Sequence, residues 1–347
     1  MASVPERFVR TGLYFYYEST TNPTLAMITF HCLESGALVR RVVEKPQTLP
    51  DNVLWVDLLS PDIEEERFVE AALGLDIPTR EELAEIEDSS RFYEEHGAIF
   101  MTTTVVMGIA ERRPQNAQVT FVLTRRCLVT VRYAELSPFR QFEAKVARQP
   151  AAYSASHPIF LGLADAVVDR VADVLESVQV QLQELSRRIF DHPDEKRTDL
   201  EQIIQQLGQH RSLLSQLGES LFSSSRLIAF YRLHGGDAKQ DGAKGALKAL
   251  ERDVRSLGEH QARLLGDIAF LLDATLGLIN IEQNAIIKVF SIAAVLFLPP
   301  TLVGTVYGMN FERMPELSWS FGYPMALVAM VVSAIIPYAW FKFRNWL

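Results

Sequence analysis

The end of the chain is dominated by two apolar runs. Residues 289–311 and 317–341 contain no Asp, Glu, Lys or Arg. At about 1.5 Å per residue, each run is long enough to cross the ~30 Å hydrocarbon layer of a bilayer as a helix. The pattern predicts membrane spans over 286–310 and 322–342, an external loop over 311–321 and a basic tail over 343–347. The tetrapeptide Tyr307-Gly308-Met309-Asn310 is expected at the membrane surface between the spans.

The first part of the chain alternates short β-rich runs with helical patterns. Gly36 and the turn residues between Pro46 and Pro50 separate the first runs. The sequence predicts helices over 64–72 and 79–87, and strands over 26–32, 37–43, 53–58, 98–107, 118–123 and 127–133. Strands interleaved with helices predict an α/β domain, which we place in the cytosol over residues 1–155.

Long helical patterns follow this domain. Residues 159–190 are amphipathic and end at His192-Pro193, and 195–234 form a second run that ends at Gly235-Gly236. A third pattern begins near Ala246 and runs into the first apolar run with no stop signal before Pro299. A helix from about Ala246 to Met309 would be roughly 95 Å long, which is more than a bilayer needs. We therefore expect a helical stalk over 156–285.

The charges that flank the spans predict their orientation. Lys288 precedes the first span, Lys342 and Arg344 follow the second, and Glu312, Arg313 and Glu316 lie in the loop between them. Basic residues accumulate on the cytoplasmic side of membrane proteins. Both termini are therefore expected in the cytoplasm.

Composition and motifs narrow the function. A net charge of −9 argues against nucleic acid as a partner and suits a protein that handles cations. Only Cys32 and Cys127 are present, so no disulfide framework is implied. The seven histidines form no H-E-x-x-H motif, and neither a phosphate-binding loop nor a G-x-S-x-G motif occurs. We expect no enzymatic activity, no organic cofactor and no ATP coupling.

One stripe of the first span repeats at alternating steps of four and three residues. This period of 3.5 keeps a helix face towards a common axis. It fits either packing against other helices or a water-filled pathway. We call this stripe the seam; its members are Asn280, Asn284, Ile287, Ser291, Ala294, Leu298, Thr301, Thr305 and Gly308.

Two adjacent prolines favour the water-filled alternative. Pro299 and Pro300 remove the amide partners of the carbonyls of Val295 and Leu296. Within a membrane, freed carbonyls are tolerated only against protein or water. Two spans cannot enclose a pore, so this interpretation requires a ring of several copies.

Asn310 lies at the outer end of the seam. A ring of amide oxygens accepts hydrogen bonds from the water molecules of a hydrated cation, which suits Mg²⁺ because it dehydrates reluctantly. Gly308 allows close approach of the chains. Glu312 and Glu316 would attract cations to the outer mouth.

The outer segment resembles the CorA-type magnesium channels. The residues that carry the resemblance are Tyr307 to Glu312, Met314 to Leu317, Trp319 and the end from Lys342 to Leu347. It extends more loosely to Asp165, Asp169 and Asp173, which are similar to the family's acidic helix. It implies a funnel-shaped homopentamer with an α/β/α sandwich, whose first span lines the pore and whose filter is Gly308, Met309 and Asn310.

The resemblance also implies a passive, potential-driven transport of magnesium across the inner membrane, with cobalt and nickel as further substrates. Pore constrictions map onto Asn284, Ile287, Phe290, Leu298 and Thr301. Phe290 departs from the seam, which contains Ser291 at that level. Leu298 and Ile287 are candidates for hydrophobic constrictions that close by dewetting.

Regulation by internal Mg²⁺ would use carboxylates at subunit contacts, because a divalent ion bridges like charges that otherwise repel. The candidates are Glu82, Asp88, Asp253, Glu259, Asp267 and Asp273. The alternative for each is an ordinary solvated helix face.

Two other functions fit parts of the pattern. Related zinc transporters share the Gly-x-Asn signature but lack the Met314-Pro315-Glu316-Leu317 run, which favours magnesium. A membrane-tethered coiled-coil scaffold would also have long amphipathic helices. It would not need adjacent prolines, a hydroxylated seam or an acidic outer loop.

Overall fold

The structure is a computed structural model of the chain, and it describes residues 27–44, 46–83, 87–111, 113–190, 200–235, 241–310 and 314–344. The chain folds as two compact units. The first comprises Met1–Gln181 and His210–Leu265, and the second comprises Leu182–Gln209 and Gly266–Leu347.

A mixed seven-stranded sheet forms the centre of the first unit. Its strand order is β2-β1-β3-β7-β6-β5-β4. β3 and β7 pair in parallel, with Trp55 opposite Leu128, and the other neighbours are antiparallel. The strands are β1 (Met27–Glu34), β2 (Ala37–Val43), β3 (Val53–Leu59), β4 (Phe92–Glu95), β5 (Ala98–Met107), β6 (Gln115–Leu123) and β7 (Leu128–Arg132).

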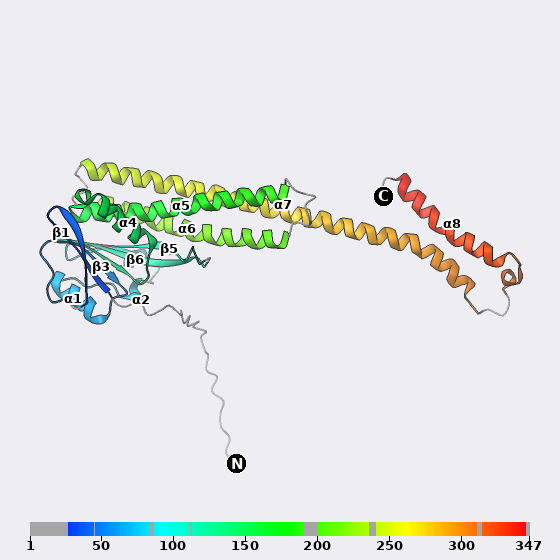
Figure 1. Cartoon of the computed structure of the whole chain (residues 1–347), viewed down its shortest axis with the longest axis horizontal. Helices are drawn as coiled ribbons and strands as arrows, with labels where there is room; N and C mark the ends of the chain where they lie inside the picture. The colour runs from blue at the N-terminus through cyan, green and yellow to red at the C-terminus, as the bar shows by residue number, and fades with distance from the viewer. Residues whose placement is uncertain are drawn as a thin grey trace, which may run out of the picture. The chain divides into compact units, whose positions relative to one another are not determined.

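Helices cover both faces of this sheet (Figure 1). On one face, α1 (Ile63–Leu73) and α2 (Arg80–Leu83) bury Val69 and Leu83 in a core with residues of the sheet. The opposite face is covered by α4 (Ser137–Arg148) and by the first-unit parts of α5 (Ser156–Phe190) and α6 (Leu200–His234). The predicted α/β/α sandwich is thereby confirmed.

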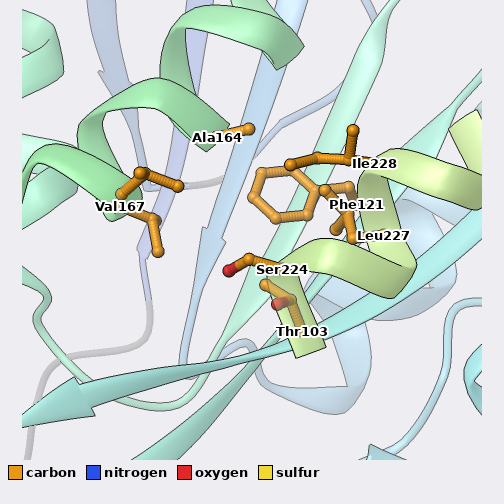
Figure 2. Close-up of a pocket in the computed structure, with 8 residues that line it drawn as sticks. Thr103, Phe121, Ala164, Val167, Ser224, Leu227 and Ile228 are labelled. Carbon is orange, nitrogen blue, oxygen red and sulfur yellow. The ribbon is translucent and has the colours of Figure 1, made fainter. Parts of the chain in front are cut away.

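Small hydroxyl side chains let α6 approach the sheet closely. The Oγ of Ser220 donates to the carbonyl of Thr104 at 2.7 Å, and Ser223 Oγ accepts from the amide of Thr104 at 3.1 Å. Beside them lies a cavity of about 10 Å³, lined mainly by apolar side chains of β5, β6, α5 and α6 (Figure 2). A cavity of this size holds at most one water molecule, so it is a packing gap.

The two predicted apolar helices are present at the end of the chain. α7 (Asp241–Tyr307) is one continuous helix of 67 residues, and α8 (Gly322–Phe343) follows the short helix η3 (Pro315–Ser318). Two of the helices that the structure describes are long and apolar enough to cross a membrane. They are α7, over Lys244–Tyr307, and α8.

The structure corrects several predicted elements. The helix expected over 79–87 is one turn, α2, followed by the short helix α3 (Asp88–Arg91); Glu87 is not helical and 84–86 lie outside the described residues. Strand β4 has four residues, too few for a period-two pattern, and was not predicted. α4 was also missed, although Phe139, Phe142 and Val146 are buried at helical spacing. α7 begins at Asp241 rather than near Ala246, and ends two residues before Met309.

A buried ion pair links the parallel central strands to α4. Arg132 donates to both carboxylate oxygens of Asp57, at 3.1 and 2.7 Å, and its guanidinium lies 4.6 Å from the ring centroid of Phe139. Thr130 donates to Asp57 at 2.7 Å and accepts from the indole of Trp55 at 2.9 Å. The carboxylate is thus fully partnered, as a buried charge requires.

His31 lies beside this network. Its ring stacks on Trp55 at 3.9 Å between centroids, and its Nε2 is 3.6 Å from the carboxylate of Glu143, which also pairs with Arg40 at 3.3 Å. Burial lowers the pKa of His31 to about 4; Asp57 opposes this shift and Arg40 adds to it. Burial raises the pKa of Glu143. The folded domain therefore holds His31 neutral at physiological pH.

Acid is expected to destabilise the first unit through His31. Because its pKa is lowered on folding, the unfolded chain binds the proton first, so stability is fully present above pH 6.5 and is lost as pH falls towards 4. The loss is up to about 3 kcal/mol at 1.36 kcal/mol per pKa unit. Hydrogen exchange of β1 and β3 in His31→Phe and unmodified protein, compared at pH 7 and pH 5, measures it.

The raised pKa of Glu143 has the opposite effect, because protonation of Glu143 in acid favours the folded state. The contribution of His31 is therefore the difference between the stability lost by the unmodified protein and that lost by His31→Phe. Glu143→Gln serves as the control, because it should leave the His31 effect in place. An equal loss of protection at pH 5 in the His31→Phe protein and the unmodified protein would contradict the assignment.

Candidate functional site

The seam occupies a face of α7 that is exposed within the chain. Leu298 and Phe290 each expose 72% of their surface, and Ile287 exposes 61%. The other predicted pore-lining residues of this helix are exposed as well: Asn284, Ala294, Thr301 and Thr305. Both Phe290 and Ser291 are exposed, so this single chain does not distinguish between them. In a single chain, the apolar and polar side chains of the seam are therefore not buried by any other segment that the structure describes.

The opposite face of α7 is half-buried. Leu296, Val303 and Tyr307 follow each other at helical spacing there, and Gly304 lies against Met330 of α8. Val303 is two residues beyond Thr301, which is about 200° around the helix. α8 presents the buried residues Gly322, Ala326 and Phe341. Thr301 thus faces away from Val303, and Gly304, the residue that contacts α8, lies between the half-buried side and the seam.

The hydroxyls of the seam donate to the backbone of their own helix. Thr301 Oγ1 donates to the carbonyl of Phe297, and Thr305 Oγ1 donates to the carbonyl of Thr301, both at 2.8 Å. With its proton used in this way, each hydroxyl offers only acceptor lone pairs to its surroundings. Water bound to a cation is a hydrogen-bond donor. These threonines are therefore suited to accept from a hydrated ion.

The helix ends at the Gly-Met-Asn segment. The amide of Gly308 donates to the carbonyls of Gly304 at 3.0 Å and Thr305 at 3.2 Å, and the amide of Met309 donates to Val306 at 3.3 Å. A Cβ at Gly308 would lie 3.2 Å from the carbonyl oxygen of Gly304, so glycine fits this turn best. Met309 and Asn310 are exposed. The segment begins where the seam ends.

The outer loop is only partly described. Glu312 lies outside the described residues, and the side chain of Glu316 does as well, although its backbone belongs to η3. Ser318 Oγ donates to the carbonyl of Pro315 at 2.7 Å, and the amide of Gly322 donates to the carbonyl of Trp319 at 3.1 Å. These bonds shape the entry into α8.

The predicted regulatory carboxylates are spread over the chain. Glu82 caps α2, accepting from the amide of Thr79 at 2.8 Å and from its hydroxyl at 3.1 Å. Asp88 belongs to α3, and its side chain lies outside the described part. The candidates on α7 are exposed: Asp253, Glu259, Asp267 and Asp273. Within the described residues of one copy, no three acidic, His or Cys side chains gather as a metal site.

The structure does bring Asp253 towards the acidic face of α5. The pKa of Asp169 is raised, first by burial and then by Asp165, Asp173 and Asp253, while Lys145 opposes the shift. Lys145 pairs with Asp165 at 2.9 Å. The spacing of the three α5 residues was visible in the sequence. Their proximity to α7 was not, because it depends on the packing of distant segments.

Together, the α/β/α domain, the long helices and the two apolar helices give the architecture of a protein whose last two helices are able to cross a membrane. Residues 50–342 match the model of the CorA-like Mg²⁺ transporter protein family. The chain is 36% identical over 325 residues to the magnesium transport protein CorA of Salmonella typhimurium, covering 92% of this chain and all of the relative. The chain therefore belongs to the CorA-like Mg²⁺ transporter family, whose members are transporters and not enzymes.

Solved structures agree on the fold. The complete structure of the CorA magnesium transporter from Methanocaldococcus jannaschii matches with a TM-score of 0.72 at 16% identity, covering 94% of this chain and 100% of that chain. The ZntB cytoplasmic domain from Vibrio parahaemolyticus matches with a TM-score of 0.56 at 10% identity, covering 74% and 98%. At these identities the likeness concerns the fold alone.

Cysteine accessibility tests whether the seam faces water. We expect Thr301→Cys and Thr305→Cys to react with a hydrophilic thiosulfonate reagent in membranes, because α8 does not cover these two positions. Val303→Cys, on the half-buried face, is the matched control and should react slowly. Native Cys32 and Cys127 are buried and their thiol pKa values are raised by burial, which keeps background labelling low. Equal labelling at all three positions would contradict a seam facing water.

Proposed function

We propose that several copies of this chain form a passive magnesium channel, with the seam of each copy facing a shared, water-filled axis. The observation that carries the proposal is the exposed seam, which runs along α7 and ends at Gly308, Met309 and Asn310. The hydroxyl and amide side chains of this stripe gain nothing from facing lipid tails, and copies arranged around an axis would give them a shared polar surrounding. The family's relatives named as magnesium transport proteins support the choice of ion.

The proposed filter acts on the hydrated ion. Mg²⁺ holds an octahedral shell of water and dehydrates reluctantly. A ring of Asn310 side chains provides amide oxygens that accept from those waters, and Gly308 keeps the turn narrow. Thr305 and Thr301 would continue the acceptor lining inwards. Co²⁺ and Ni²⁺, which are also divalent, are the further substrates we propose.

The membrane potential supplies the driving force. A divalent ion gains about 4.6 kcal/mol per 100 mV, twice the figure for one charge, so uptake needs no ATP. Such a pathway needs a closing device. We propose that rings of Leu298 and Ile287 narrow the axis and exclude water. The basic residues Lys288, Lys342 and Arg344 support cytoplasmic termini and, in a bacterial cell, an inner-membrane location.

Closure is proposed to respond to Mg²⁺ at cytosolic contacts between copies. Carboxylates of one copy would meet those of the next at these contacts, where a divalent ion could bridge them. Asp253 is the candidate with the most support, because it adds to a negative field that already involves Asp165, Asp169 and Asp173. We propose that this assembly is a homopentamer.

Neither alternative function gains support from a specific observation. The zinc interpretation has only the likeness to a ZntB cytoplasmic domain at 10% identity. A scaffold leaves the hydroxylated seam without a purpose, and membership of a transporter family speaks against it.

Replacement of Asn310 tests the filter. In proteoliposomes that contain a magnesium-sensitive dye, Mg²⁺ uptake by the unmodified protein should be blocked by cobalt hexaammine, a fixed mimic of the hydrated ion. Asn310→Ala is expected to abolish uptake, because the amide acceptors are lost. Val328→Ala, an exposed position on α8, is the control. Uptake that persists in Asn310→Ala at the unmodified rate would exclude this filter, and no cation uptake by the unmodified protein would support the scaffold.

Neutralisation of the carboxylates tests the regulation. Asp253→Asn, together with Glu259→Gln, Asp267→Asn and Asp273→Asn, is expected to shift inhibition by internal Mg²⁺ to higher concentrations, because the carboxylates that would hold the bridging ion are removed. Glu82→Gln is measured separately. Its amide oxygen can still accept the hydrogen bonds from Thr79 at the start of α2, so the variant removes the charge of Glu82 without removing these bonds. Flux is measured against internal Mg²⁺, and an unchanged inhibition curve would remove these residues from the sensor.

A further inference from the structure

Gly304, in the last turn of α7, lies against Met330 of α8. A Cβ built at this position would lie 3.2 Å from the terminal methyl of Met330. Nine in ten real Cβ contacts are longer than such a distance, so the two helices approach here because residue 304 has no side chain. The contacting atom is the end of an unbranched, adaptable side chain, and the backbone carbonyl of Met330 accepts from Ser333 Oγ at 2.8 Å. The contact is therefore close, and the methionine fills the space that the glycine leaves.

The same glycine is bonded directly to the filter segment. Its carbonyl accepts from the amide of Gly308 at 3.0 Å, and a Cβ at Gly308 would lie 3.2 Å from that carbonyl oxygen. Any displacement of Gly304 therefore moves the acceptor that holds Gly308. Met330, Gly304 and Gly308 form a short, continuous chain of contacts from α8 to the start of the Gly-Met-Asn segment.

The prolines make the last turns of α7 depend on this contact. Pro299 and Pro300 lack amide hydrogens, so two hydrogen bonds that would join the outer turns to the rest of the helix are missing. Helices bend most readily at such positions. The orientation of residues 301–307 therefore depends on packing against α8 as well as on the backbone of α7.

We propose that Gly304 and Met330 are positioning residues, through which α8 sets the distance of the Gly308–Asn310 segment from the channel axis and thereby its selectivity for a hydrated divalent ion. Neither residue touches the ion. This inference rests on the proposed function and goes beyond it, because it assigns a role in selectivity to a helix that does not line the axis.

A size exchange across the contact tests the proposal. Gly304→Leu overpacks the contact and is expected to raise the half-blocking concentration of cobalt hexaammine about tenfold, with a loss of preference for Mg²⁺ over Ni²⁺. Adding Met330→Ala removes the overlap and should restore both values. Met330→Ala alone should loosen the segment and weaken block, whereas the volume-conserving Met330→Leu should not.

The matched control is Val331→Ala, the neighbouring exposed residue of α8, which should leave block and selectivity unchanged. If Gly304→Leu fails to assemble, the two Met330 variants decide the question. Unmodified block and selectivity in the folded Met330→Ala protein would overturn the inference while leaving the proposed channel intact. Absence of Mg²⁺ uptake by the unmodified protein would instead overturn the proposed function.

Discussion

The one-sided packing of α7 is the constraint on which the rest of the second unit depends. A helix in a bilayer gains little from burying apolar side chains, so its contacts are made where residues are small enough for close approach. Gly304 provides such a point, and Met330 fills it. Because α8 covers this face, the seam with Thr301 and Thr305 is left free. A further helix packed on the seam side of α7 would have covered these residues.

The hydrogen-bond chemistry of the free face follows from the same helix. In water, a threonine hydroxyl both donates and accepts, but Thr301 and Thr305 have committed their protons to the carbonyls one turn earlier. Their remaining acceptor capacity has the polarity that a hydrated cation needs, and it would be poorly suited to an anion. This face of α7 thus carries hydrogen-bond acceptors without a charged side chain, which would cost several kcal/mol within a span.

Patterns that repeat along the sequence were sufficient for much of this description. The absence of charge predicted the two apolar helices, and the alternation of strands and helices predicted the α/β domain. The α/β/α layering was implied by the resemblance to the CorA-type channels. What sequence reasoning missed depends on contacts between distant segments or on very short elements. β4 is too short to show a period, Asp253 approaches α5 only after folding, and the partner of Gly304 lies 26 residues away on another helix.

Glu82 illustrates how the structure changes the weight of a candidate. As one carboxylate in an acidic stretch, it was a plausible ligand for a regulatory ion. In the folded chain it accepts two hydrogen bonds from Thr79 and thereby starts α2, so part of its acceptor capacity is already in use. An ion bound to this carboxylate would compete with the two hydrogen bonds from Thr79. Exposed carboxylates such as Asp253 face no such competition, and a weakly bound regulatory ion would be held there at lower cost.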